Sequence, residues 1–305
     1  MSFSFDAKIE MIGKVNKPCC AFAQSCGFLV FGRTFGRDSI SLMTDHEEIA
    51  AAYADAVRFA AAVEPVTVRS DAGRYNVSVP TAGDRKKVMR AFGYEGEEMS
   101  VRLNFANIGD RCCRAAFIRG AFLACGSVTD PNKEYHLELS VGSMGLTNDF
   151  IKLFDAYDGS DPELDFTLVP NRSQRSGMNV IYFNDSTSVE DFLALTGAQN
   201  AAMRVMNTKM FKELRNNVNR RFNFETANIE RSSRASEPQI RAIEKLVARD
   251  ALDELPPELR QLAELRADEP ALSLRELGEL MDPPLSRTAV NYRLKKIVDF
   301  AKQLD

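Results

Sequence analysis

The chain has no tryptophan, few histidines and no long hydrophobic run among its 305 residues. No apolar stretch approaches the roughly 18 residues that a membrane-spanning helix needs. The opening segment, Met1 to Glu10, does not show the basic residues and apolar stretch of a signal peptide. We therefore expect a cytoplasmic protein that has no membrane partner.

The cysteines lack the spacing of a zinc site. No Cys-x-x-Cys pair occurs, and the chain has only two histidines. Reduced and largely buried thiols are the ordinary state of cytosolic cysteines. The sequence therefore predicts no metal site, no other cofactor and no small-molecule substrate. The six cysteines are Cys19, Cys20, Cys26, Cys112, Cys113 and Cys125.

Acidic and basic residues are unevenly distributed along the chain. Residues 1–203 hold 20 Lys and Arg against 26 Asp and Glu, and residues 234–305 hold 12 against 14. Residues 204–233 instead hold 7 against 3. Because a phosphate-binding surface needs clustered positive charge, we expect any contact with nucleic acid to come from residues 204–233 and from the last helix.

Two predicted helices near the end of the chain form the clearest functional motif. Ser273–Met281 is typical of a short helix, Asp282–Leu285 stops it with two prolines, and Ser286–Val298 begins a second helix. Ser273 and Glu276 predict a capping box on the first helix, and the second begins at a capping serine. Two helices joined by a tight break are the helix-turn-helix plan, in which the second helix enters the DNA major groove.

The second helix has one apolar and one polar face. Residues at helical spacing should pack on the preceding helices, namely Val290, Leu294, Ile297, Val298 and Ala301. On a recognition helix, N-terminal Arg and Asn side chains contact base edges, and basic residues farther along contact phosphates. We predict contacts with double-stranded DNA from Ser286, Arg287, Thr288, Asn291, Tyr292, Arg293, Lys295 and Lys296. The alternative is a solvated amphipathic helix in a structural three-helix unit. The turn has no glycine, which departs from the simplest helix-turn-helix pattern.

Residues 19–92 and 111–196 are expected to form two copies of one order of elements, αββαββα. The first copy is expected to have helices up to Gly27, at 47–63 and at 84–92, and strands at 28–35, 39–43, 66–69 and 75–79. The second is expected to have helices at 111–124, at 148–157 and from a Thr187 cap to Gly197, and strands at 127–128, 135–141, 166–169 and 179–183. The Cys-Gly pairs of the opening helices lie 99 residues apart. Such a repeat normally builds a pseudo-twofold domain with these helices side by side; the alternative is two unrelated α+β lobes.

The segment Ile118–Val128 resembles the LAGLIDADG helix of homing endonucleases. Gly120, Ala124 and Gly126 stand where that motif has small residues for close packing of two helices. The resemblance implies that the tandem repeat has the fold of such a nuclease.

The acidic positions of the nuclease motif are missing from this chain. In an active member of that family, the last acidic position of each motif ligates a divalent metal, and the matching positions here are Cys125 and, in the first copy, Cys26. Mg²⁺ demands oxygen ligands, so we predict a nuclease fold without nuclease chemistry. The alternative is an active endonuclease that uses other acids, such as Asp38 or Asp130.

Residues 200–233 are predicted to form a long helical connector. An apolar stripe recurs every four residues from Met206 to Phe222, and basic residues cover much of the rest. Asparagine is a mediocre helix former, so its abundance between residues 215 and 228 predicts specific hydrogen bonds or helix breaks. The candidates for contact with DNA or with the adjoining domain are Arg215, Asn216, Asn219, Arg220, Asn223 and Asn228.

The chain resembles the WhiA family of bacterial transcription regulators over nearly its whole length, and four segments carry the likeness. They are Cys112–Val128, Tyr135–Glu138, the asparagine-rich segment Arg215–Asn228, and Leu274–Ser286. The most specific parts of this likeness are the Arg-Asn-x-Val-Asn-Arg run and the helix pair around Asp282-Pro-Pro.

The resemblance to WhiA implies an α+β fold with three parts. These are a degenerate homing-endonuclease repeat at residues 1–200, a basic helical linker at 201–233 and an all-α helix-turn-helix domain at 234–305. It also implies promoter binding without enzymatic activity, association with the nucleoid, a role in cell division and chromosome segregation, and sporulation control in filamentous relatives. A second regulator, a sigma factor or RNA polymerase is a candidate partner. The competing hypothesis is a protein–protein adaptor whose helix pair binds such a partner in place of DNA.

Overall fold

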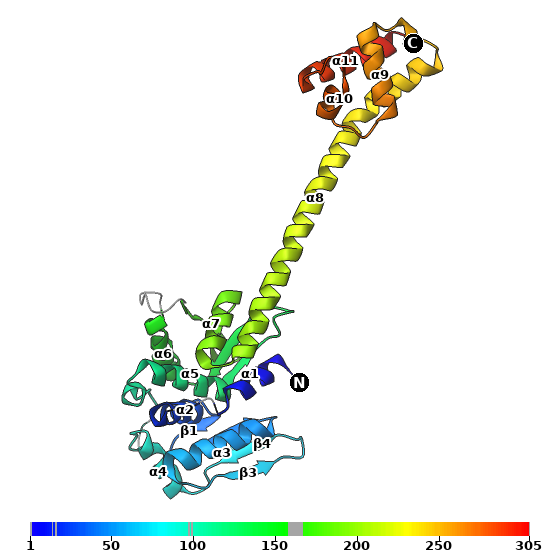
Figure 1. Cartoon of the computed structure of the whole chain (residues 1–305). Coiled ribbons are helices and arrows are strands. Elements are labelled where there is room, and N and C mark those ends of the chain that lie inside the picture. Colours follow the sequence, from blue (N-terminus) through cyan, green and yellow to red (C-terminus); the bar gives the residue numbers. More distant parts are fainter. Residues whose placement is uncertain are drawn as a thin grey trace. The chain divides into compact units, whose positions relative to one another are not determined.

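The computed structural model describes residues 2–13, 15, 17–96, 98, 100–157 and 167–304, except for the side chain of Ser232. The chain is divided into two compact units, Met1–Lys212 and Glu213–Asp305 (Figure 1). Each unit has its own hydrophobic core. No helix within the described ranges is long and apolar enough to cross a membrane.

The N-terminal unit repeats one order of elements after a first helix, α1 (Phe3–Met11). The first copy consists of α2 (Pro18–Val30), β1 (Thr34–Phe35), β2 (Ile40–Thr44), α3 (Glu47–Ala61), β3 (Val66–Arg69), β4 (Tyr75–Ser78) and α4 (Ala82–Ala91). The second consists of α5 (Arg111–Cys125), β5 (Gly126–Val128), β6 (Leu137–Val141), α6 (Met144–Ile151), β7 (Asn171–Arg175), β8 (Met178–Phe183) and α7 (Ser186–Thr196). Short helices η1 (Phe105–Ile108) and η2 (Lys152–Tyr157) precede α5 and follow α6. The predicted αββαββα order is confirmed.

Each copy contributes a four-stranded antiparallel sheet with the same strand order. The orders are β1-β2-β4-β3 and β5-β6-β8-β7. Leu42 pairs with Val77 between β2 and β4, and Leu139 pairs with Ile181 between β6 and β8. These four side chains are at most 2% exposed, so one face of each sheet lies on the core. The shared topology confirms the internal repeat.

The two opening helices, α2 and α5, lie side by side in the middle of this unit (Figure 1). An added Cβ at Gly27 would lie 2.2 Å from the carbonyl oxygen of Phe117, and one at Gly120 would lie 2.1 Å from that of Gln24. Only glycine allows backbones to approach this closely. The two contacts are reciprocal, because Gly120 follows Gly27 by 93 residues, as Phe117 follows Gln24. The copies are therefore offset by 93 residues at these helices, and the predicted offset of 99 is wrong.

Two of the predicted strands are also wrong. Residues 28–30 belong to α2, because a short buried apolar run fits the inside of a helix as well as a strand. Only Thr34–Phe35 of the predicted strand pairs with β2. In the second copy, Phe166 lies outside the described residues and 167–170 form no strand. The edge strand is instead β7, whose polar and mostly exposed residues lack the alternation that predicts a strand.

Two helices of the second copy, α6 and α7, begin at other residues than the sequence predicts. The helix predicted at 148–157 starts at Met144, behind a Ser143 cap, and continues as η2. The cap of α7 is Asp185, whose carboxylate accepts a hydrogen bond from the Ser188 N–H at 2.8 Å, and not Thr187. Gly197 ends α7 at a φ of 90°, as its position predicts.

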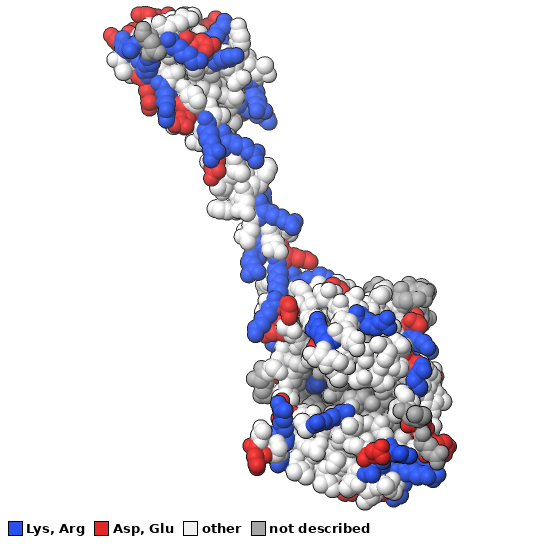
Figure 2. Space-filling view, turned by 180° about the vertical axis from the view of Figure 1, so that it is seen from behind, with Lys and Arg blue, Asp and Glu red and all other residues white. Residues whose placement is uncertain are grey.

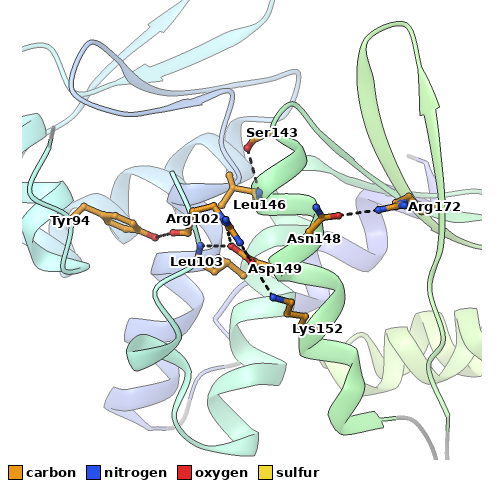
Figure 3. Close-up of polar contacts among 9 residues, drawn as sticks. All are labelled: Tyr94, Arg102, Leu103, Ser143, Leu146, Asn148, Asp149, Lys152 and Arg172. Atoms are coloured by element: carbon orange, nitrogen blue, oxygen red, sulfur yellow. Dashed lines mark hydrogen bonds and ion pairs between the residues drawn. The ribbon is translucent and has the colours of Figure 1, made fainter. Parts of the chain in front are cut away.

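Asp149 on α6 holds the segment that connects the two copies (Figure 3). Its side chain is 4% exposed and accepts two hydrogen bonds of 2.6 Å from the Arg102 guanidinium. The Leu103 N–H donates a third at 3.2 Å, and the Lys152 ammonium lies 3.7 Å away. The hydrogen bonds from Arg102 are the main reason that the pKa of the Asp149 carboxyl lies below its usual value. The Tyr94 hydroxyl donates to the Arg102 carbonyl at 2.8 Å and fixes the same segment.

Replacing Asp149 with Asn removes the charge from this contact. We expect the free energy of unfolding of the N-terminal unit to fall by about 2 kcal/mol near neutral pH, the size of a hydrogen bond to a charged group. Because the folded pKa is lowered, the wild-type advantage is complete above the ordinary carboxyl pKa and disappears as the pH falls through the folded value. Urea denaturation over this pH range tests the prediction, with the exposed Asp155→Asn as control. A variant that unfolds like wild type near neutral pH would contradict it.

The C-terminal unit is helical. Its elements are the end of the long helix α8 (Gln199–Ala248), η3 (Leu252–Glu254), α9 (Pro257–Asp268), α10 (Leu274–Leu280) and α11 (Arg287–Gln303). The core includes Leu246 of α8, Leu262 of α9, Leu277 of α10, and Val290 and Leu294 of α11, all fully buried. The asparagine-rich segment causes no helix break, because α8 runs through it and past residue 233. The predicted all-α helix-turn-helix region is confirmed.

Candidate nucleic-acid interface

The caps of α10 and α11 are those that the sequence predicts. The Glu276 N–H donates to the Ser273 hydroxyl at 3.3 Å, and the Glu276 carboxylate accepts from the Ser273 N–H at 2.7 Å. This is the capping box. At the start of α11, the Ser286 hydroxyl accepts from the Ala289 N–H at 3.2 Å. Both helices therefore begin at fixed residues, which determines which side chains of α11 face outward.

The turn itself has no glycine, but it packs against a glycine of α10, Gly278. The Leu285 N–H donates to the Gly278 carbonyl at 2.8 Å, so the turn folds back onto this helix. An added Cβ at Gly278 would lie 2.2 Å from the Leu285 carbonyl oxygen and 3.2 Å from a Val290 methyl group. A glycine is thus required where α10, the turn and α11 meet. The sequence contained one indication of this contact, because a glycine inside a helical pattern often has a packing role.

The two faces of α11 agree with the predicted pattern. Val290, Leu294, Ile297 and Ala301 are buried, and Val298 is half-buried. The exposed residues include seven of the eight predicted DNA contacts, namely Ser286, Arg287, Thr288, Asn291, Tyr292, Lys295 and Lys296. The Lys296 ammonium lies 4.8 Å from the centre of the Tyr292 ring, a cation–π contact that orients both. Within the described part of this unit, Arg287, Lys295 and Lys296 form no ion pair.

Arg293 is the exception among the predicted contacts. Its guanidinium lies 2.6 Å from the Glu258 carboxylate at the start of α9, and its side chain is only 24% exposed. Arg293 therefore joins α11 to α9, and its charge is already compensated within the protein. The sequence did not reveal this pairing because the two residues belong to different helices.

Arg266 is a further residue whose role the sequence did not reveal. It is 2% exposed and donates to the carbonyl of Leu272 at 2.7 Å and to that of Pro270 at 3.4 Å. Burial lowers the pKa of this guanidinium below its usual value. These contacts fix the connection from α9 to α10, although an arginine in a polar stretch ordinarily indicates an exposed position.

The long helix α8 carries the second group of predicted contacts. All six residues, Arg215, Asn216, Asn219, Arg220, Asn223 and Asn228, are exposed. At 3.6 residues per turn, the first five fall within an arc of about 140° of the helix surface, and Asn228 lies outside it. Lys209 and Lys212, earlier in α8, instead donate hydrogen bonds to Thr187 and Pro131 of the N-terminal unit. Figure 2 shows that Lys and Arg outnumber Asp and Glu along this helix.

A cavity of about 920 Å³ lies at the C-terminal ends of α2 and α5. Gly32, Arg33 and Cys125 line it. With the 93-residue offset, the counterpart of Cys125 is Gly32, so the predicted counterpart, Cys26, is wrong by six residues. Cys26 is instead buried below the Asn107 amide, whose nitrogen lies 3.6 Å from its sulfur.

Neither of the two symmetric positions at this cavity offers a carboxylate. The Cys125 thiol donates to the Ala121 carbonyl at 3.4 Å, and burial raises its pKa to about 12. Gly32 has no side chain. Of the two acids considered as replacements, Asp38 lines the cavity, is 91% exposed and pairs with Arg37. Asp130 is not part of the cavity lining and accepts two hydrogen bonds of 2.9 Å from Asn132.

Models of known protein families match parts of both units. Residues 114–215 match a model of the WhiA LAGLIDADG-like domain, and residues 218–301 match a model of the WhiA C-terminal HTH domain. A relative from Syntrophomonas wolfei, named probable cell division protein WhiA, is 32% identical, and the match covers 100% of this chain and 99% of the relative. The chain belongs to the WhiA family.

Other WhiA proteins agree with this assignment. The WhiA of Carboxydothermus hydrogenoformans, also named a probable cell division protein, is 36% identical over 72% of this chain and 68% of its own. The crystal structure of full-length DUF199/WhiA from Thermotoga maritima matches 99% of both chains with a TM-score of 0.61 and 20% identity, which supports the fold. The resemblance expected from the sequence is confirmed.

Gly278 provides a test of the helix-turn-helix geometry. We expect Gly278→Ala to lower the free energy of unfolding of the C-terminal unit by about 1–3 kcal/mol, the usual cost of overpacking. The new methyl group must displace the Leu285 carbonyl, which lies 2.2 Å from its position. Thermal melting followed by circular dichroism measures the effect. Leu280→Ala is the control, because this side chain on the same helix is 59% exposed. Equal melting temperatures for Gly278→Ala and Leu280→Ala would contradict the need for a glycine at this contact.

Proposed function

We propose that this protein is a sequence-specific, double-stranded DNA-binding transcription regulator that has no nuclease activity. The observation that carries the proposal is the outward face of α11. Arg287, Asn291 and Lys295 are exposed there, opposite the buried side that holds Val290 and Leu294. A capped helix with one apolar face packed and one basic face free is what a recognition helix requires.

The residues of this face divide into two roles. In the proposal, Arg287 and Asn291 contact base edges, because Arg pairs with guanine and Asn with adenine in the major groove. Ser286 and Thr288 stand in the same first turn. Lys295 and Lys296, farther along the helix, contact phosphates. Arg293 is left out of the DNA-contacting set, since Glu258 neutralises its charge.

The polar arc of α8 supports a second set of phosphate contacts. Arg215 and Arg220 lie on this arc, and within the described residues neither forms an ion pair. Asparagine side chains at 216, 219 and 223 supply neutral donors between them. Such contacts position a protein on a duplex without reading its sequence. We propose that this arc adds affinity, while α11 supplies specificity.

The proposed biological role follows that of the relatives. They are named cell division proteins, and we propose that this protein acts in cell division and chromosome segregation by regulating promoters, with sporulation as a further target in sporulating relatives. A second regulator, a sigma factor or RNA polymerase is the proposed class of protein partner.

The proposed absence of nuclease activity rests on the cavity at the ends of α2 and α5. Metal-dependent cleavage needs carboxylates at the two symmetric positions to hold the ions that activate water. Gly32 and Cys125 occupy these positions. Incubation of the pure protein with plasmid and Mg²⁺ or Mn²⁺ should leave the plasmid intact, and reproducible cleavage would refute this part of the proposal.

Substitution of the base-reading residues tests sequence recognition. We expect Arg287→Ala or Asn291→Ala to reduce discrimination between a bound site and its scrambled version by about 1–3 kcal/mol for each side chain that no longer reads a base. Genome-wide mapping of bound DNA supplies the site, and fluorescence anisotropy measures both affinities. Arg241→Ala is the control, because it removes another exposed positive charge, one that pairs with Glu237, from α8 in the same unit. Equal weakening on both DNAs would reject the base-reading role.

Salt dependence tests the phosphate contacts separately. We expect Lys295→Ala to weaken binding to all sequences alike and to reduce the slope of log affinity against log salt by about 1. Arg293→Ala should change this slope less, since Glu258 already compensates its charge. A complete lack of salt-sensitive DNA binding by the wild-type protein would favour the adaptor hypothesis in place of DNA binding.

A further inference from the structure

Four cysteines meet at the N-terminal ends of α2 and α5. The sulfur atoms of Cys19, Cys20, Cys112 and Cys113 all lie within 4.8 Å of one another. The prediction from the sequence found no zinc-site spacing and did not reveal this group. It relied on ligand spacing along the chain, whereas this group forms only when the two helices lie side by side.

The cluster follows the internal symmetry of the unit. Cys112 follows Cys19 by 93 residues, as Cys113 follows Cys20, which is the offset fixed by Gly27 and Gly120. Each pair occupies the second and third residues of its helix, since α2 begins at Pro18 and α5 at Arg111. Two identical half-sites are thus brought face to face by the same packing that defines the fold.

The spacing of the sulfurs fits a single metal ion. Four sulfurs held about 2.3 Å from one zinc ion at the corners of a tetrahedron are about 3.8 Å apart. The observed limit of 4.8 Å needs only small side-chain rotations to reach this distance. An iron–sulfur cluster places several irons and bridging sulfides between the cysteines and needs a larger separation. A set of four thiolates on a tetrahedron is typical of structural zinc.

The surroundings also suit a zinc–thiolate centre. Cys20 and Cys113 are buried, while Cys19 and Cys112 are exposed, so an ion can reach the site from the surface. Zinc with four thiolates carries a net negative charge, and the N-terminal ends of two helices stabilise negative charge. The residues just before the helices, Lys17 and Asp110, have opposite charges and largely cancel.

We propose that Cys19, Cys20, Cys112 and Cys113 bind one Zn²⁺ ion in a closed, structural site that joins the two copies of the repeat. Binding deprotonates the four thiols, and the protons pass to solvent. All four ligands come from the protein, so no position remains open for substrate and the site has no catalytic role. The ion would fix α2 to α5 at the ends farthest from the cavity that Gly32 and Cys125 line.

Metal analysis of the full-length protein tests this site. For protein purified under reducing conditions without chelator, elemental analysis should give close to one zinc per chain. Replacement with Co²⁺ should give the intense thiolate charge-transfer band and the visible bands of a tetrahedral all-sulfur site. The double variant Cys19→Ser/Cys112→Ser should lose both, whereas the control Cys125→Ser, outside the cluster, should keep both. A chelator should lower the melting temperature of the wild type and not that of the double variant.

Several results would overturn the proposal. Wild-type protein that stays metal-free after incubation with Zn²⁺ under reducing conditions has no such site. Full metal content in the double variant would place the ion elsewhere. Disulfides among these cysteines in protein prepared anaerobically would assign them a redox role. If the double variant fails to fold, the wild-type protein alone still tests the zinc site. Its Co²⁺ spectrum and the effect of a chelator on its melting temperature require only the native chain.

Discussion

The backbone contact between α2 and α5 is the constraint on which the N-terminal unit depends. Gly27 and Gly120 allow the two helices to touch at the carbonyls of Phe117 and Gln24, and any side chain at either glycine would separate them. This contact fixes how the two copies are aligned. It thereby brings the four clustered cysteines together at one end of the helices and Gly32 and Cys125 at the other.

The C-terminal unit uses the same physical device on a smaller scale. Gly278 lets the turn before α11 hydrogen-bond directly to the backbone of α10. Arg266 then fixes the connection from α9 to α10 through backbone carbonyls, and Arg293 joins α11 to α9 through Glu258. In both units, glycine determines how closely helices approach, and charged side chains hold the connecting segments. Asp149 and Arg102 do so in the N-terminal unit.

Local patterns predicted the parts of the fold that depend on local interactions. The caps at Ser273 and Ser286 and the buried face of α11 follow from side chains within one helical turn of each other, and the structure has them as expected. The strand predicted at 28–35 was wrong at residues 28–30, because a short buried apolar run has no period that separates a helix from a strand. β7 was missed because an exposed polar edge strand has no apolar alternation.

Contacts between distant residues explain what the sequence did not reveal about the candidate sites. Two Cys-Gly pairs suggested an alignment of the repeats, but only the backbone contacts showed that Gly32, and not Cys26, corresponds to Cys125. The cysteine cluster and the pair of Arg293 with Glu258 likewise join separate helices. Which side chains α11 exposes was predictable, but which of its charges are already compensated was not.

The outward side chains of α11 have little part in holding their own domain together. Arg287, Asn291 and Lys295 are exposed, while Val290, Leu294 and Gly278 carry the packing. Substitutions at the exposed positions should therefore cost little folding stability. The charge and shape of this surface can therefore change without a compensating change in the core.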